Sequence, residues 1–412
     1  MTERRRAVIT GMGVVAPGAL DVETLFRRLV AGASSIGPIR RFDASGFPSR
    51  IAGEVTDVDS GPYGRIASFA LAAADQAVTQ AQLAGGRVGV VVAAGLGSYD
   101  HDEAFGPLLA RPGAWDGADF NELLLQSLKE HSMARRTPGT VSRLVAERFG
   151  FTGPVMSVMT ACAGGTQAIG DALRWIRNGT VDVAVAGGSD SELYPMGLAS
   201  FCLLGALSTR NDEPMQASRP FDARRDGFVI GEGAGVLVLE EREHALLRGA
   251  PILAEVSGFG AACDAYRVTD PHPDGVGAVL AMRRAISDAG LSPREIDYVN
   301  AHGTSTPAND RIETLALKAV LGTRAHEVPI SSTKSMIGHL TVAAGAVEAV
   351  VTALTLAGQT IHPTINLTEK DPDCDLDYVP GAAREAKVNA ALSSSFAFGG
   401  QTACLVLTRG AA

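Results

Sequence analysis

One cysteine and two histidines lie in short segments whose neighbours are typical of a reactive site. Cys162 ends a strand-like run and is followed at once by small residues and a helical pattern. A thiol at the start of a helix faces unpaired backbone N–H groups and the positive end of the helix dipole, and both favour the thiolate. A lone cysteine in such a turn is more often a small buried residue, however. Cys162 is therefore a candidate nucleophile only if catalytic partners exist elsewhere.

His302 and His339 are the candidate partners. His302 follows a short strand-like run and begins a polar, glycine-containing loop. His339 follows a second such run and precedes an Ala/Gly/Val-rich helical stretch at 341–357. Neutral imidazoles can donate hydrogen bonds to an oxygen on which negative charge develops. Two such loops together with one thiol favour covalent catalysis by Cys162 over a purely structural cysteine.

The segments that must position these residues alternate between strand and helix patterns. Strand-like runs are expected at 7–15, 87–95, 153–161, 181–188, 252–260, 296–301, 328–332 and 388–396. A helix is predicted directly after the cysteine, with an apolar face made of Ile169, Ala172, Leu173 and Ile176. This alternation favours layered α/β structure.

The same segments resemble the β-ketoacyl-acyl-carrier-protein synthases of the thiolase superfamily, namely the KAS II type and the related type II polyketide ketosynthases. The resemblance extends from Ala7 to about Leu407. It is carried, in chain order, by residues 160–162, 219–222, 227–235, 300–307, 332–339 and 396–400. The resemblance implies a thiolase-like fold in which two similar α/β halves form a layered α-β-α-β-α core.

The resemblance also implies how the chain is divided. The alternation of strand-like and helical patterns is interrupted around residue 250. The first expected half is therefore residues 1–250, with the nucleophilic cysteine, and the second is residues 251–412, with both catalytic histidines. No internal sequence repeat establishes this division independently.

The reaction implied is the decarboxylative Claisen condensation of an acyl thioester with malonyl-acyl-carrier protein, in fatty-acid or polyketide elongation. Cys162 would carry the acyl group as an acyl-enzyme. His302 and His339 would hydrogen-bond the malonyl thioester carbonyl, and the backbone N–H groups of Cys162 and Phe398 would form the oxyanion hole. Which group initiates decarboxylation is left open by the sequence.

Further roles follow from the resemblance alone. Lys334 would pair with Glu313 and hold the charge balance of the site. A gating loop is expected to contain Ala397, Phe398 and Gly399. The hydroxyl groups expected to contact the phosphopantetheine arm are those of Thr304 and Thr306.

Some positions depart from the family pattern. Ala397 replaces a frequent Gly, Gly164 a frequent Ser, Ile337 a frequent Thr, and Thr341-Val342 a frequent Leu-Gly. Segment 98–140 also matches poorly. An added Cβ at position 397 narrows the conformations of the gating loop. A specialised acyl substrate and neutral drift are both compatible with these changes.

Other functional classes fit the sequence less well. Residues 11–16 fit the G-x-G-x-x-A dinucleotide pattern of oxidoreductases, but Pro17-Gly18 prevents a helix from starting there, and the expected acidic residue is missing. A non-catalytic chain-length partner typically lacks the active cysteine. The alternatives within the family are an elongating fatty-acid enzyme and the ketosynthase α subunit of a polyketide system.

The composition of the chain indicates which classes of partner and which cellular compartment to expect. The 412-residue chain has 46% hydrophobic residues and a net charge of -9, which gives no support for nucleic-acid binding. No apolar run long enough to span a membrane is expected, and five widely spaced cysteines favour a reducing cytoplasm over a disulfide framework. No metal site or resident cofactor is expected. The implied partners are acyl carrier protein and a second subunit, as a homodimer or as a heterodimer with a chain-length factor.

Acyl carrier proteins are typically acidic, so docking needs a local basic patch despite the acidic total. The candidates by clustering alone are Arg65, Arg135, Arg136, Arg143, Arg224 and Arg225.

Overall fold

The computed structural model describes residues 4–95, 137 and 139–410. Within these residues, ten strands form one sheet in the order β10-β9-β13-β14-β8-β1-β7-β6-β4-β5. They are β1 (Ala7–Val15), β4 (Val88–Ala94), β5 (Val155–Val158), β6 (Val183–Asp190), β7 (Gly233–Glu241), β8 (Ala254–Cys263), β9 (Tyr298–Asn300), β10 (Ile330–Ser331), β13 (Ala390–Phe396) and β14 (Gln401–Thr408). Two small sheets are formed by β2 (Ile36–Pro38) with β3 (Ile51–Gly53), and by β11 (Thr360–Ile361) with β12 (Arg384–Glu385).

The strand pairing is the same on the two sides of the central β1–β8 pair. On one side β1, β7 and β6 are antiparallel neighbours, and β6, β4 and β5 run parallel. On the other side β8, β14 and β13 are antiparallel, and β13, β9 and β10 run parallel. The α/β class and the two similar halves predicted from the sequence are thus present. The dividing point near residue 250 lies between α11 (Arg242–Leu247) and β8.

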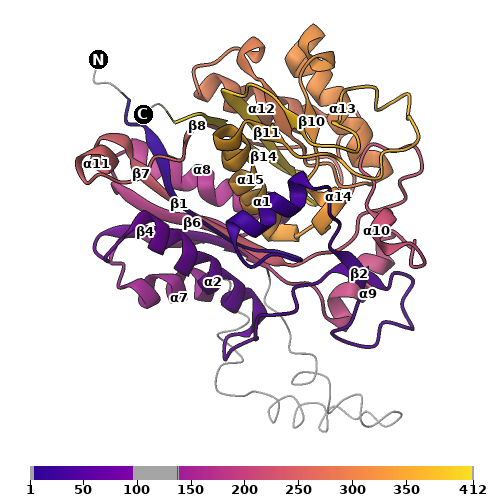
Figure 1. The fold of residues 1–412 in the computed structure, drawn as a ribbon, viewed down its shortest axis with the longest axis horizontal. Helices are drawn as coiled ribbons and strands as arrows, with labels where there is room; N and C mark the ends of the chain where they lie inside the picture. The colour runs from indigo at the N-terminus through magenta and orange to yellow at the C-terminus, as the bar shows by residue number, and fades with distance from the viewer. Residues whose placement is uncertain (1–3, 96–136, 138, 411–412) are drawn as a thin grey trace.

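The helices form layers on both sides of these strands (Figure 1). The outer helices of the first half are α2 (Gly64–Ala81) and α7 (Gly139–Phe149), and those of the second are α12 (Val276–Asp288) and α13 (Pro307–Leu321). Between the halves lie α8 (Gly164–Arg177) and α15 (Ala344–Gly358), which contact each other and strands of both halves. The other α-helices in the described part of the chain, besides α11, are α1 (Val22–Val30), α9 (Pro195–Leu203), α10 (Pro214–Ala217) and α14 (Lys334–Ile337).

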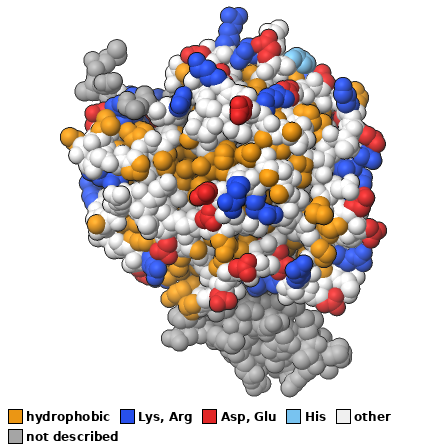
Figure 2. Space-filling model, in the orientation of Figure 1, with side chains coloured by type: hydrophobic (Ala, Val, Ile, Leu, Met, Phe, Trp, Pro, Cys, Tyr) orange, Lys and Arg blue, Asp and Glu red, His pale blue; other side chains and the backbone are white. Residues whose placement is uncertain are grey.

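Charged side chains of both signs are interspersed over the outer surface seen in Figure 2, with apolar side chains between them. One segment, Thr341–Gly358, is apolar and long enough to cross a membrane, but 83% of it is buried in the protein. The expectation that no such segment exists was wrong. The physical reason for its composition is that α15 has strands on both sides, so it needs apolar residues all round.

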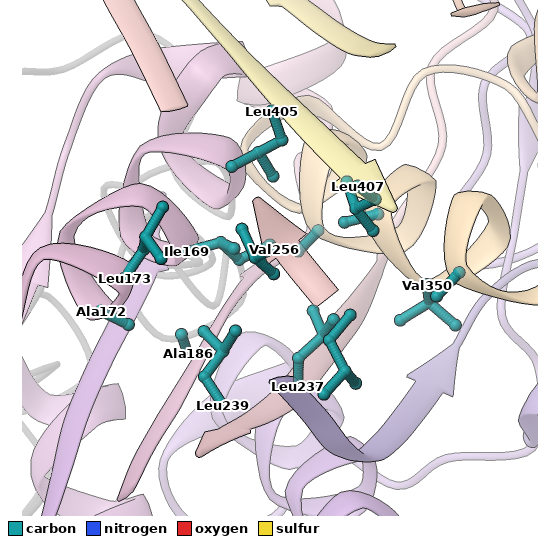
Figure 3. Packing of buried hydrophobic residues seen from close by; sticks show 14 of the residues in the cluster. Ile169, Ala172, Leu173, Ala186, Leu237, Leu239, Val256, Val350, Leu405 and Leu407 are labelled. Atoms are coloured by element: carbon teal, nitrogen blue, oxygen red, sulfur yellow. The ribbon is translucent and has the colours of Figure 1, made fainter. Parts of the chain in front are cut away.

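The central core is made of side chains that α8 and α15 share with the two sets of strands (Figure 3). Ile169 and Leu173 of α8 pack in one cluster with Leu237 of β7, Val350 of α15 and Leu405 of β14, and all five side chains are fully buried. The predicted apolar face of α8 is confirmed. Each such side chain contributes about 1.5–3 kcal/mol relative to exposure, so this cluster fixes the two halves against each other.

The glycines of the apparent dinucleotide motif serve helix packing. Gly11 and Gly13 lie inside β1 rather than in a turn. A Cβ at Gly13 would lie 1.9 Å from the carbonyl oxygen of Ala73 in α2, and a Cβ at Gly11 would lie 2.0 Å from that of Ala77. Only glycine allows the helix backbone to approach the strand this closely.

All eight strand-like runs predicted from the sequence contain strands, most of them shorter than predicted. β7 and β14 were missed. β7 begins in the glycine-rich segment 231–235, which is more typical of a loop, and β14 is a continuous apolar run that periodicity alone does not distinguish from a helix.

Replacing Gly13 by Ala is expected to lower the free energy of unfolding by about 1–3 kcal/mol, because the added methyl group overlaps the α2 backbone. Gly46→Ala is the matched control, since a Cβ at Gly46 meets no atom within 4 Å. Denaturant unfolding of the two variants measures the difference. Equal midpoints would show that the close approach of α2 does not depend on glycine.

Candidate active site

The site lies where parallel strands of both halves end. In the second half, β9 leads into His302, β10 into Lys334, and β13 into Phe398. These three strands are parallel neighbours, with Asn300 in register with Ser331 and Ser393. The carboxyl ends of parallel strands lie along one sheet edge, so residues far apart in sequence meet there.

The first half delivers Cys162 in the same way. β5 ends at Val158, and the short 3-10 helix η1 (Ala161–Ala163) connects it to α8. Ala161 has a φ of 44°, a left-handed conformation that turns the chain sharply between strand and helix. Cys162 therefore lies at the start of α8, as the sequence predicted.

Cys162, His302 and His339 line one cavity of about 290 Å³. Other predicted site residues that line it are Thr304, Thr306, Ala397 and Phe398. The apolar part of its wall includes Phe201, Leu204 and Phe228. The thiol, both imidazoles and the predicted pantetheine contacts thus share one pocket.

The Cys162 thiol is not a preformed thiolate in this structure. Burial raises its pKa to about 12, against the opposing effects of the Lys334 charge and of the backbone N–H groups of Cys162 and Phe398, which point at the sulfur. The charge of Asp190 raises the pKa further. The expectation of a lowered thiol pKa was therefore wrong, because desolvation outweighs the helix terminus. The two N–H groups predicted for an oxyanion hole do converge at the thiol.

The two histidines are neutral and lie edge to face. Their ring centroids are 5.2 Å apart, and the rings are nearly perpendicular. Burial and the nearby Lys334 charge hold the pKa of both imidazoles well below the usual range. Phe396 packs against His302 and Phe228 against His339, at centroid distances of 5.5 and 5.2 Å.

The hydrogen bonds at Nδ1 determine where each imidazole carries its proton. Nζ of Lys334 lies 3.4 Å from Nδ1 of His302, and the backbone N–H of Thr341 donates to Nδ1 of His339 over 3.3 Å. A neutral imidazole that accepts at Nδ1 carries its proton on Nε2. Both histidines therefore have an Nε2–H group to donate, as an oxyanion in the pocket requires.

Lys334 pairs with Glu348 rather than with Glu313. Its Nζ donates to Oε1 of Glu348 on α15, and both side chains are almost fully buried. The two carboxylate oxygens of Glu313 instead accept the backbone N–H groups of His302 and Gly303, over 2.8 and 2.7 Å. The predicted Lys334–Glu313 pair was wrong because α15, not α13, brings a carboxylate to the ammonium group. Glu313 fixes the loop that carries His302.

Of the remaining predicted residues, Thr304, Thr306 and Ala397 line the pocket, and Gly399 does not. Oγ1 of Thr304 and Oγ1 of Thr306 are 2.9 Å apart, and Thr306 also caps α13. Gly399 lies on an exposed turn with a φ of 85°, where its N–H donates to the carbonyl of Val268. Ala397 has no positive φ, so its backbone conformation does not require glycine.

Sequence reasoning missed two buried carboxylates of the site. Glu348 is the only charged residue in the apolar stretch 341–357, and an isolated acid in a core helix is a usable signal. Asp190 at the end of β6 accepts hydrogen bonds from the Thr341 hydroxyl and from the Val342 N–H, the latter over 3.1 Å. No sequence pattern distinguished Asp190 from other acids near strand ends.

Two departures from the family pattern compensate for each other. Gly164 and Val342 face each other, and a Cβ at position 164 would lie 2.9 Å from Cγ1 of Val342. A serine at 164 would therefore need the smaller residue that relatives frequently carry at 342. The poorly matching segment 98–140 falls mostly outside the described residues.

The arginines proposed for carrier docking are not one patch. Arg65 and Arg225 are buried and bonded to Glu232 and Asp371, respectively, so this assignment was wrong for both. Arg143 and Arg224 are partly exposed and paired with neighbouring acids. Arg135 and Arg136 lie outside the described residues.

Comparison with protein families places most of the chain in two matching models. Residues 4–245 match the beta-ketoacyl synthase N-terminal domain, and residues 253–368 match the beta-ketoacyl synthase C-terminal domain. The chain is 42% identical to 3-oxoacyl-[acyl-carrier-protein] synthase 2 of Synechocystis sp., covering 99% of each chain. It is also 42% identical to a putative polyketide beta-ketoacyl synthase 1 of Streptomyces cyaneus, covering 98% of each.

Solved structures give the same relationship. A type II polyketide ketosynthase, solved in complex with its acyl-carrier protein, superposes with a TM-score of 0.90 at 36% identity, and the match covers 99% of this chain and 100% of that one. The ishigamide ketosynthase/chain length factor gives a TM-score of 0.89 at 37% identity, with the same coverage. The thiolase-like fold predicted from the sequence is confirmed.

Replacing Asp190 by Asn should make Cys162 more reactive, because the carboxylate charge that raises the thiol pKa is removed while the side-chain shape is kept. A pKa lowered by about one unit corresponds to about a tenfold faster alkylation by iodoacetamide at a fixed pH. Mass spectrometry of the Cys162 peptide measures the rate. The control is Glu147→Gln, an exposed acid on α7. An unchanged rate in Asp190→Asn would show that this carboxylate does not act on the thiol.

Proposed function

The chain belongs to the beta-ketoacyl synthase family, and we propose that it condenses an acyl thioester with malonyl-acyl-carrier protein, with loss of carbon dioxide, to give a β-ketoacyl-acyl-carrier protein. The observation that carries this proposal is the convergence of one thiol, two neutral imidazoles and two backbone N–H groups in a single pocket. Acyl transfer needs a nucleophile and an oxyanion hole, and decarboxylation needs donors for an enolate oxygen. All three requirements have matching groups here.

In the first step, the sulfur of Cys162 attacks the thioester carbonyl of an acyl group on a carrier. The backbone N–H groups of Cys162 and Phe398 point at the sulfur, where they can donate to the oxyanion that forms. The carbon–sulfur bond to the carrier breaks, and the carrier thiol leaves with the proton that Cys162 gives up. The product is a thioester between the acyl group and Cys162.

In the second step, malonyl thioester bound in the same pocket loses its carboxylate as carbon dioxide. The electron pair of the broken carbon–carbon bond forms an enolate, whose oxygen accepts hydrogen bonds from Nε2–H of His302 and of His339. The enolate carbon attacks the acyl carbonyl, and Cys162 leaves as the new carbon–carbon bond forms. Burial and the Lys334 charge, which Glu348 holds in place, keep the imidazoles neutral donors. This chemistry needs no metal or resident cofactor.

The substrates are carried by acyl carrier protein on a phosphopantetheine arm. Thr304 and Thr306 line the pocket with their hydroxyl groups 2.9 Å apart, which suits hydrogen bonding to the amides of such an arm. The aromatic and aliphatic wall formed by Phe201, Leu204 and Phe228 suits an acyl chain. Ala397, Phe398 and Gly399 form the gate between arm and chain. A cytoplasmic location fits five free cysteines.

A second subunit would bind along β5. This strand is an edge of the large sheet, and its first residue, Val155, and the residue that follows the strand, Met159, are each 47% exposed. An exposed apolar edge strand is a common pairing surface between subunits. We infer a dimer, either of two identical chains or of this chain with a chain-length factor.

Fatty-acid elongation is the first candidate pathway, since the 42% identical Synechocystis relative is a 3-oxoacyl-[acyl-carrier-protein] synthase. A polyketide ketosynthase α subunit is the second. The observation that favours it is the close superposition on type II ketosynthases, including one solved with a chain-length factor. Size-exclusion chromatography of the chain alone and with a co-expressed chain-length factor distinguishes a homodimer from a heterodimer.

Cys162→Ala is expected to abolish acylation of the protein by acyl-acyl-carrier protein, because no other thiol lines the pocket among the described residues. Intact-protein mass spectrometry measures the added acyl mass. Cys263→Ala, which removes an exposed thiol, should acylate normally. Acylation of Cys162→Ala at the wild-type level would refute the proposed nucleophile.

His302→Ala or His339→Ala should slow condensation by about 10²-fold or more, the typical effect of removing one oxyanion donor. Acylation of Cys162 should fall much less, because the backbone N–H groups remain. Product formation from malonyl-acyl-carrier protein and the acylation rate are measured separately. His244→Ala, on the surface helix α11, is the control. Near-normal condensation by both variants would rule out the enolate-binding role.

A further inference from the structure

Thr341 has an unusual backbone conformation directly beside the active site. Its φ is 48°, in the left-handed region that a β-branched residue rarely adopts. Such a conformation costs of the order of 1–3 kcal/mol and persists only where the surroundings hold it. Thr341 begins the 3-10 helix η4 (Thr341–Ala343), lies two residues after His339 and lines the catalytic cavity.

Asp190 holds this residue from the other half of the fold. The Thr341 hydroxyl donates to Oδ2 of Asp190, which also accepts the Val342 N–H over 3.1 Å. Oδ1 accepts the N–H of Ser191 over 2.9 Å. Asp190 is 1% exposed, and a Cβ at Gly95 would lie 2.2 Å from its Oδ1. The carboxylate is thus confined, and its position is defined by β6.

The backbone conformation of Thr341 determines the hydrogen bond to His339. Its N–H donates to Nδ1 of the imidazole over 3.3 Å, and this bond leaves the proton on Nε2. Phe228 also packs against the ring, at a centroid distance of 5.2 Å. A rotation of the Thr341 peptide would remove the donor from Nδ1 and free the imidazole to change tautomer.

The corresponding turn in the first half has no such anchor. Ala161, with a φ of 44°, begins η1 before α8 just as Thr341 begins η4 before α15. Alanine has no hydroxyl group, and related enzymes frequently carry leucine at position 341, which also has none. The carboxylate–hydroxyl bond is therefore a feature of this chain and not a requirement of the turn.

We propose that Asp190 and Thr341 are a positioning pair for His339: the turn adopts its left-handed conformation without a hydroxyl group, as at Ala161, and the added hydroxyl–carboxylate bond restricts the motion of Thr341. Its N–H thereby fixes the Nε2–H tautomer and the orientation of the imidazole that binds the malonyl-derived enolate. This inference rests on the proposed condensation. The Thr341 hydroxyl group separates the two half-reactions, because it acts on His339, whereas acyl transfer uses the Cys162 thiol, which the Asp190 charge also affects, and the backbone N–H groups of Cys162 and Phe398.

The test compares Thr341→Val, which keeps the branched shape and loses the hydroxyl group, with Thr341→Ser, which keeps the hydroxyl group. In Thr341→Val, kcat for condensation should fall about tenfold or more, since small displacements of a catalytic group have effects of this size. Acylation of Cys162 should stay within about twofold of wild type, and Thr341→Ser should restore condensation to within about threefold. Wild-type condensation by Thr341→Val, or an equal loss in both half-reactions, would overturn the proposal.

A second measurement does not depend on activity or on the folding of a variant. Nitrogen-15 NMR of histidine-labelled wild-type protein reports the tautomer of His339, assigned by the signal missing from His339→Ala. The Nε2–H form is expected, and a predominant Nδ1–H form would refute the proposal. If the wild type shows the Nε2–H form but makes no condensation product, the proposed function fails while the positioning of His339 stands.

Discussion

One buried ammonium group, paired with one buried carboxylate, acts together with desolvation on the protonation of all three reacting groups. Lys334 and Glu348 are each about 2% exposed and bonded to each other. Removing one partner of such a pair costs about 3–5 kcal/mol, because the other charge is left buried and unpaired. Burial lowers the pKa of His302 and of His339, and with the pair intact the nearby positive charge lowers both pKa values further, so that both imidazoles stay neutral. The Lys334 charge also partly offsets the effect of burial on the Cys162 thiol.

The pair connects this chemistry to the architecture. Lys334 follows the second-half strand β10, and Glu348 projects from α15, which packs on strands of both halves. A displacement of α15 against the strands would therefore change the fold and the protonation of the site together. The same helix begins at the turn that Asp190 holds from the first half. The catalytic groups of the two halves are thus joined by polar contacts as well as by the apolar core.

The departures from the family pattern become interpretable once their neighbours are known. Val342 occupies space that Gly164 leaves open, so these two changes form one packing unit. Thr341 exchanges an apolar side chain for a hydroxyl group with a buried acceptor. Ala397 has an ordinary backbone conformation, and its effect on the gate is not explained by its φ. The Gly164 and Val342 changes concern packing between the two halves, and only the Thr341 change involves a residue that contacts His339.

The sequence by itself determined the α/β class, the positions of most strands, the helix after Cys162, and the cysteine and two histidines that the structure brings into one pocket. Those predictions depend on local periodicity and on motifs that are contiguous in the chain. The sequence did not identify β7 and β14, because a strand that is buried on both faces shows no alternation of polar and apolar residues.

Only the tertiary structure decided which groups are partners and which protonation states they have. The pairing of Lys334 with Glu348 rather than Glu313, and the hydrogen bond from Thr341 to Asp190, join residues that different strands and helices bring together. The raised thiol pKa depends on desolvation, which is a property of the assembled pocket. Such effects depend on distance and burial in three dimensions, and neither is encoded in the spacing of residues along the chain.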